Sequence, residues 1–312
     1  MSQPAPRPAG ITVMERGWLS SNNILLHGAT AEEGAILVDT GYASHSAQTL
    51  ALIANALRPR EVVRLIANTH LHSDHCGGNH AVSKRYDCPI LIPPGEFSAI
   101  AQWNESALSY VATGQQCEQF SPAGKLIPGD TLPQGSLDWQ IHAAPGHDPH
   151  SIILFEPESR TLISADALWE RGFGIVFPEL DGDCAFAEVE STLAVIEDLQ
   201  PKLVIPGHGA PFQDLQTALN SARERLEYFI RKPERHALHA VRALTVFHML
   251  EVRQSSLEEL LTWLQRTPIL ISTWQSFFSS TTLSVWTNQL LQELVRAGAL
   301  RQDSNTIYAR GV

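Results

Sequence analysis

Residues 69–79 read Thr69-His70-Leu71-His72-Ser73-Asp74-His75-Cys76-Gly77-Gly78-Asn79 and follow the apolar run VVRLIA of residues 62–67. Such a run is typical of a buried strand, so three imidazoles and one carboxylate lie where a strand ends in a loop. Zn²⁺ and similar metals favour imidazole nitrogen together with carboxylate oxygen. In extended backbone, His70 and His72 point the same way and can bind one ion. Asp74 and His75 face a second position once the chain turns. This density of donors predicts a metal site rather than a loop of solvated histidines.

Three further metal donors occur later in the chain. They are His147, Asp166 and His208, and each comes shortly after an apolar run that is typical of a strand. Sites in α/β folds lie at the carboxyl ends of strands. Taken singly, each of these residues can be an ordinary turn residue. Taken with the first motif, they predict one site that several strands build together.

Strand-like and helix-like runs alternate through the first two thirds of the chain, which predicts a layered α/β architecture with two sheets inside. We expect strands at residues 11–14, 23–26, 35–38, 62–67, 90–92, 137–143, 151–155, 161–164 and 203–205, and helices at 46–57, 96–112 and 186–199. From about residue 215 we expect four amphipathic helices, at 217–231, 234–252, 257–265 and 283–297, and then a terminal hairpin. The chain is accordingly divided into an N-terminal arm (residues 1–10), a main domain (11–216) and a helical accessory domain (217–312).

Composition limits the classes of protein to consider. The 312 residues carry a net charge of −11, which argues against indiscriminate binding to nucleic acid. No apolar run approaches the ~20 residues that span a bilayer. The opening MSQPAPRPAG lacks the apolar core of a signal peptide, and the four cysteines show no CxxC spacing. We therefore expect a cytoplasmic protein without a membrane partner.

The net charge is unevenly distributed along the chain. Residues 1–220 carry 11 basic and 25 acidic side chains (−14), whereas residues 221–312 carry 11 basic and 8 acidic ones (+3). An acidic main domain thus precedes a mildly basic accessory domain. RNA therefore stays open as a partner, although we favour a small molecule.

The order HxHxDH, GH, strand-terminal Asp and PGHG resembles the metallo-β-lactamase superfamily of metallohydrolases over about residues 11–212. The resemblance implies an αββα sandwich with a dinuclear site at one edge of the two sheets. By the same resemblance, the first metal would be bound by His70, His72 and His147, the second by Asp74, His75 and His208, and both by a bridging Asp166. Asp39, in Leu37-Val38-Asp39-Thr40-Gly41, matches the family's aspartate that orients the histidine loop. It can also be an ordinary turn residue.

The expected chemistry follows from two divalent cations, which we expect to be Zn²⁺, although iron and manganese use the same donors. Two cations that share a water lower its pKa towards ~7 and so supply hydroxide for attack on a carbonyl or phosphoryl centre. Asp166 would hold the metal spacing, and Asp74 could take up the proton. His150, just after His147, is an additional imidazole. It can donate a proton to the leaving group, contact the substrate or simply be a loop histidine.

We expect the substrate to be an ester, thioester or lactone of a small molecule. The alternatives are an endoribonuclease that cleaves single-stranded RNA with the same site, and a nucleic-acid-binding regulator whose hydrolase site is vestigial. The C-terminal segment resembles the winged-helix-like domain of one superfamily branch that includes an endoribonuclease. It shows no stripe of Lys and Arg interleaved with aromatic residues, so we expect it to cover the mouth of the site or to form a homodimer.

Overall fold

The computed structural model describes residues 9–105 and 107–310. The expected N-terminal arm therefore lies outside the described residues, apart from its last two positions. Within the described ranges, no helix is both long enough and apolar enough to cross a membrane.

Six strands form the first sheet in the order β1-β2-β3-β4-β5-β6. They are β1 (Ile11–Met14), β2 (Asn23–Leu26), β3 (Ala35–Val38), β4 (Val63–Ala67), β5 (Ile90–Ile92) and β6 (Gly124–Lys125). Pairing is antiparallel from β1 to β3 and parallel from β3 to β6. Parallel neighbours require crossover connections. The connecting segments carry η1 (Ala43–His45), α1 (Ser46–Ala56), α2 (Ser73–Cys76), α3 (Asn79–Tyr86), α4 (Phe97–Gln102) and α5 (Ser109–Thr113).

Five strands form the second sheet in the order β11-β10-β9-β8-β7. They are β7 (Thr131–Gln134), β8 (Leu137–Ala143), β9 (Ile152–Glu156), β10 (Thr161–Ala165) and β11 (Leu203–Pro206). Only the pair β10 and β11 is parallel. Its crossover contains α6 (Phe177–Asp181) and α7 (Phe186–Leu199), and α7 buries Val189, Leu193 and Ile196 at helical spacing.

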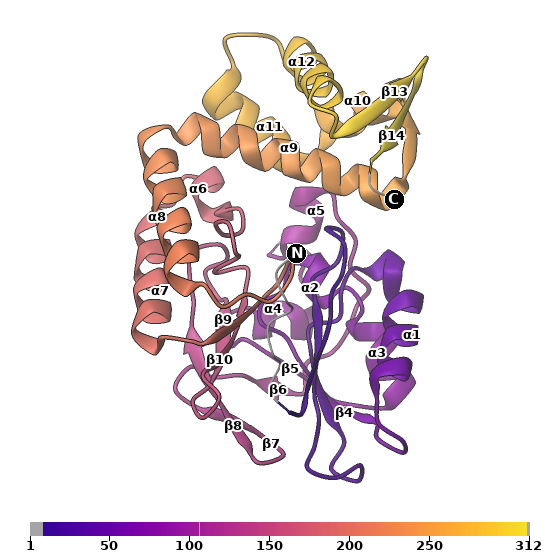
Figure 1. Cartoon of the computed structure of the whole chain (residues 1–312). Coiled ribbons are helices and arrows are strands. Elements are labelled where there is room, and N and C mark those ends of the chain that lie inside the picture. The colour runs from indigo at the N-terminus through magenta and orange to yellow at the C-terminus, as the bar shows by residue number, and fades with distance from the viewer. Residues whose placement is uncertain (1–8, 106, 311–312) are drawn as a thin grey trace.

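The two sheets face each other across one apolar core. Ile36 and Leu65 of the first sheet belong to the same buried cluster as Leu154 and Ile205 of the second. On the outer faces, α1 and α3 cover the first sheet, whereas α7 and α8 (Leu215–Arg231) cover the second. Figure 1 shows these four layers. The expected αββα sandwich is confirmed.

The C-terminal part consists mainly of helices. After α9 (Pro233–Val252) come β12 (Gln254–Ser256), α10 (Leu257–Arg266), α11 (Pro268–Thr273), the π-helical turn η2 (Trp274–Phe278), α12 (Leu283–Arg296), β13 (Leu300–Asp303) and β14 (Thr306–Ala309). The strands form a small sheet in the order β12-β14-β13. In Figure 1, α9 and α11 lie above α5 and α6, and α11 contacts both of these helices. The expected helices and hairpin are present, whereas the winged-helix assignment and the boundary at residue 216 stay predictions.

One expected helix is interrupted. Residues 96–112 form α4 and α5 separately, and the chain leaves α4 at Trp103, whose φ is 49°. The ring of Trp103 packs against Tyr110 and Phe120, with ring centroids 6.0 and 5.8 Å away. Tertiary packing of this aromatic ring thus overrides the helical pattern. The sequence analysis also missed α11, since the β-branched run of PILIST is not a strong helix signal.

Replacing a side chain between the two sheets tests the shared core. Leu154→Ala should lower the free energy of unfolding by about 3 kcal/mol, because Leu154 is fully buried and leaves a cavity. Val62→Ala is the control, since Val62 is 52% exposed and should change stability by less than about 0.5 kcal/mol. Urea unfolding followed by circular dichroism measures both values. Equal losses would argue against a core shared by the two sheets.

Candidate metal centre

The histidine loop leaves the carboxyl end of β4 and turns tightly into α2 and α3. Its two glycines have neighbours where a side chain would stand. A Cβ on Gly77 would lie 2.4 Å from the carbonyl oxygen of Ser73, and one on Gly78 would lie 2.4 Å from that of Thr40. Only glycine permits this approach. The loop is thereby pressed against the segment that follows β3.

His70, His72 and His147 form the first cluster of donors. Their candidate ligand nitrogens all lie within 4.8 Å of one another, and all three side chains are buried. His147 Nε2 is 2.8 Å from His72 Nδ1 and 3.3 Å from His70 Nε2. Burial lowers the pKa of His72 to about 4 and that of His70 well below its usual value. Both rings are therefore held neutral, which is the form that binds metal.

Asp74, His75, Asp166 and His208 form the second cluster, again within 4.8 Å of one another. His208 Nε2 lies 3.0 Å from Asp74 Oδ2. Asp166 stands between the clusters, since its Oδ1 is 3.4 Å from His75 Nε2 and its Oδ2 is 3.5 Å from His147 Nε2. His147, Asp166 and His208 follow β8, β10 and β11 of the second sheet, whereas Asp74 and His75 follow β4 of the first.

Strong charges act within the second cluster. Burial lowers the pKa of His75, but the carboxylates of Asp166, Asp39 and Asp74 outweigh it and raise that pKa well above its usual value. Burial raises the pKa of Asp166, but the neighbouring histidines outweigh it and hold that pKa well below its usual range. His75 Nε2 is nevertheless buried without a hydrogen-bond partner among the described residues. A divalent cation would satisfy this nitrogen and the carboxylates together, so the donor set fits the metal that the motif implies.

Asp39 directly follows β3 and is 2% exposed. Its Oδ1 accepts a hydrogen bond from the amide of Thr69 (2.9 Å), and its Oδ2 accepts one from the Thr69 hydroxyl (2.7 Å). Oδ2 also lies 2.7 Å from His75 Nδ1. This contact fixes the ring so that Nε2 faces the cluster. Asp39 thus makes the contacts that an orienting aspartate needs, and its role as one stays a prediction.

His150 lies outside both clusters. It is exposed, and its amide donates to Asp148 Oδ1 (2.8 Å). Its ring packs on Gly95, where a Cβ would come within 2.1 Å of His150 Nδ1. Asp148 itself reaches towards the first cluster, since its Oδ2 is 3.9 Å from His72 Nε2. The structure therefore does not bring His150 among the donors, and its role in proton transfer or substrate contact stays a prediction.

Sequence reasoning missed three aromatic residues at the centre. Trp169 donates from Nε1 to Asp166 Oδ1 (3.2 Å). Trp18 stacks on His208 with ring centroids 5.3 Å apart, and Phe177 lies 4.8 Å from the ring of His72. Trp169 is three residues after a donor and could have been considered. Trp18 and Phe177 are far from their partners in the sequence, so no local signal marks them.

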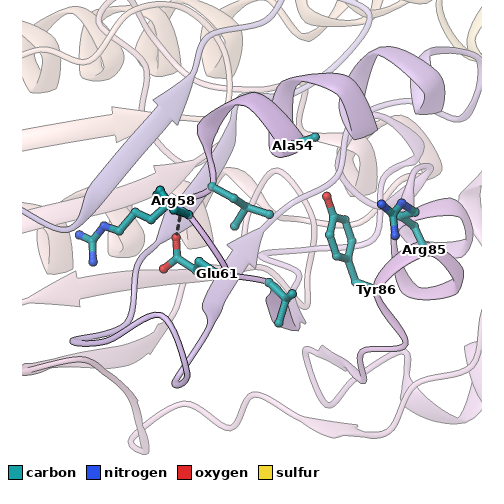
Figure 2. A pocket seen from close by; sticks show the side chains of 8 residues that line it. Ala54, Arg58, Glu61, Arg85 and Tyr86 are labelled. Atoms are coloured by element: carbon teal, nitrogen blue, oxygen red, sulfur yellow. Dashed lines mark hydrogen bonds between the residues drawn. The ribbon is translucent and has the colours of Figure 1, made fainter.

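Figure 2 shows a cavity of about 530 Å³ lined by other residues. Arg58, Glu61, Val62, Arg85 and Tyr86 are among its lining residues. Glu61 and Val62 precede β4, whereas the histidine loop follows that strand. The cavity is therefore at the opposite end of β4, and none of the seven donors lines it.

Comparison with known proteins agrees with this geometry. The family described as the metallo-beta-lactamase superfamily matches residues 16–208. An N-acyl homoserine lactonase from Bacillus cereus is 27% identical over 240 residues, covering 64% of this chain and 90% of that protein. A hydroxyacylglutathione hydrolase from Anaeromyxobacter dehalogenans is 29% identical over 207 residues, covering 66% and 69%.

Solved structures share the fold. A beta-lactamase domain protein from Burkholderia ambifaria has a TM-score of 0.58 and 21% identity, and the match covers 99% of this chain and 96% of that one. A metallo-beta-lactamase family protein from Thermus thermophilus has a TM-score of 0.56 and 20% identity, with 96% and 99% covered. Since the family match spans more than half of the sequence, the chain belongs to the metallo-beta-lactamase superfamily and is a metallo-hydrolase.

Proposed function

We propose that this protein hydrolyses an ester, thioester or lactone of a small molecule with two divalent metal ions, which are Zn²⁺. The observation that carries the proposal is the convergence of seven donors in two adjacent buried clusters with Asp166 between them. His70, His72 and His147 would hold the first ion, Asp74, His75 and His208 would hold the second, and Asp166 lies where it could serve both. Such ions would supply Lewis-acid chemistry, lowering the pKa of water and polarising a carbonyl group.

The side chains around the clusters have separate tasks. Asp39 holds His75 through Nδ1, and Trp169 holds Oδ1 of Asp166. Asp74 is the least buried of the donors, and its Oδ2 lies 3.0 Å from His208 Nε2. We assign uptake of the proton released at the site to Asp74, the most exposed of the donors. His150 is exposed, and we assign it to contact with the substrate.

An apolar acyl group of the substrate could pack against the exposed ring of Trp18. Trp18 is 61% exposed, yet its ring stacks on the ring of His208 and meets the ring of Trp169 edge-on. A large exposed indole next to donors offers a preformed contact for apolar substrate. The two relatives named above act on an acyl lactone and an acyl glutathione, which is a thioester. The acidic balance of residues 1–220 disfavours an RNA strand.

A substrate panel tests the reaction class. We expect turnover of N-acyl lactones, S-acyl thioesters or simple aryl esters, lost on treatment with a chelator and restored by Zn²⁺. Single-stranded RNA should stay intact under the same conditions. Chelator-sensitive cleavage of RNA would overturn the proposed substrate class. A purified protein without bound metal and without activity would favour the regulator with a vestigial site.

Removal of single donors tests the metal assignment. His72→Ala and Asp166→Ala should each lower kcat/KM by more than about 100-fold, because loss of a partner that merely supports a ligand already costs 10–100-fold. Metal content per chain should fall as well. His80→Ala is the matched control, since His80 lies on the neighbouring α3 and bonds to the carbonyl of Gln119. Retained activity and metal in either donor variant, with a native circular dichroism spectrum, would refute the assignment.

Truncation of Trp18 tests the acyl contact. Trp18→Ala should raise KM for a long-chain substrate by roughly tenfold, because loss of about 50 Å² of apolar contact costs ~1.3 kcal/mol. KM for a short-chain substrate should rise less, and Trp18→Phe should restore most of the difference. Steady-state kinetics with the two chain lengths measures the effect. An equal change for both would argue that Trp18 acts on His208 and not on the acyl group.

A further inference from the structure

One buried histidine of the C-terminal part makes a hydrogen bond to the segment that borders the metal centre. His236 lies in the first turns of α9 and is 2% exposed. Its Nε2 accepts a hydrogen bond from the amide of Val176 (3.1 Å). Val176 is 60 residues away and precedes α6. This hydrogen bond joins the C-terminal helices to the segment that precedes α6.

Residues 174–177, which His236 contacts, are hydrogen-bonded to two of the proposed ligands, His147 and Asp166. The amide of Gly174 donates to the carbonyl of Asp166 (2.9 Å), and that of Phe177 donates to the carbonyl of His147 (3.3 Å). His147 Nδ1 lies 2.5 Å from the carbonyl oxygen of Ile175. A Cβ on Gly174 would come within 2.4 Å of the same Nδ1. The ring of His147 is thus oriented by backbone from residues 174–177.

The two hydrogen bonds share one peptide group. The carbonyl of Ile175 and the amide of Val176 belong to the same planar unit, so a fixed N–H direction also fixes the direction of the C=O. His236 holds the amide, and the carbonyl holds Nδ1 of His147. Hydrogen bonds in such a chain polarise and strengthen one another.

We propose that His236 is a positioning residue for the first metal ion, acting through the Ile175–Val176 peptide on His147. The inference rests on the proposed metal site and extends it, because it assigns a part in metal binding to the C-terminal helices. His147 must present Nε2 to the ion and keep the proton on Nδ1. The carbonyl of Ile175 selects this tautomer, as partners of metal-bound histidines do.

The surroundings of His236 suit this task. Its ring is held edge-on by Phe186 and Phe229, at 5.3 and 5.0 Å. Burial, together with the charges of His239 and Arg225, lowers the pKa of His236 to about 3. Nε2 therefore stays unprotonated and able to accept the amide of Val176. The interaction is available throughout the neutral range.

Metal affinity separates positioning from a structural role. His236→Leu should weaken binding of one Zn²⁺ by about tenfold in competition with a chelator, which is the lower end of the cost of removing a direct partner of a metal-bound histidine, because His236 acts through one intervening peptide. His236→Gln places an oxygen near the position of Nε2 and should restore most of the affinity. In the Co²⁺-substituted protein, His236→Leu should alter the ligand-field spectrum of one ion. Thermal unfolding of each metal-free variant measures stability separately.

His239→Leu is the matched control. His239 lies one turn further along α9, with its Nε2 3.2 Å from Nη2 of Arg225, and the structure gives it no hydrogen bond to residues 174–177. This variant should bind Zn²⁺ within about twofold of the wild type while also losing some packing. Equal losses of affinity in both variants would assign the effect to general loosening of α9.

A second variant tests the same hydrogen bond from its donor side. Val176→Pro removes the amide proton, and the φ of −85° at Val176 is near the value that proline requires. It should reproduce the loss of affinity with His236 intact, even where His236→Leu does not fold. If a folded His236→Leu or Val176→Pro protein binds Zn²⁺ as tightly as the wild type, the role of His236 is refuted but the proposed metal site is not. A wild-type protein that binds no metal would overturn the proposed site as well.

Discussion

The buried carboxylate of Asp39 is the constraint on which the metal centre depends. A buried carboxylate is stable only when its oxygens accept hydrogen bonds. Here the bonds come from the amide and hydroxyl of Thr69 and from the ring of His75. Asp39 itself adopts a φ of 56°, a conformation that few residues other than glycine accept and that aspartate tolerates better than most. The start of the histidine loop and the direction of His75 therefore follow from satisfying one carboxylate.

A short N-terminal segment joins the two halves of the centre. The first sheet supplies the histidine loop, whereas the second supplies the remaining donors. The amide of Ser21 donates to the carbonyl of Asp74 (2.9 Å), and the amide of Asn22 donates to that of Gly207 (2.6 Å). The side chain of Asn22 also donates to the carbonyls of Pro206 and Gly209. These bonds fix the spacing of donors from separate sheets, in addition to the apolar core between them.

The convergence of the seven candidate donors could be predicted because each lies shortly after a strand, whereas the residues that support them could not. The motif from His70 to His75 follows one strand, and Asp166 directly follows another. His147 contacts the carbonyl of Ile175, which is 28 residues away in the sequence. The next residue, Val176, is hydrogen-bonded to His236, which is 60 residues further along. These contacts depend on how the helices pack, which the spacing of residues in the sequence does not indicate. His150 follows a donor closely in the sequence, but its ring packs on Gly95, so its role stays a prediction.

The C-terminal helices share a packed boundary with the metal centre. Phe177 contacts the rings of His72 and His147 on one side and packs against the buried C-terminal cluster on the other. Leu180 of α6 belongs to that cluster. Close-packed interiors transmit displacement, so a shift of α9 or α11 would move α6 and the wall beside the first donors. Near residue 215 helices replace strands, but residues beyond it still contact the segment at 174–180 that borders the donors.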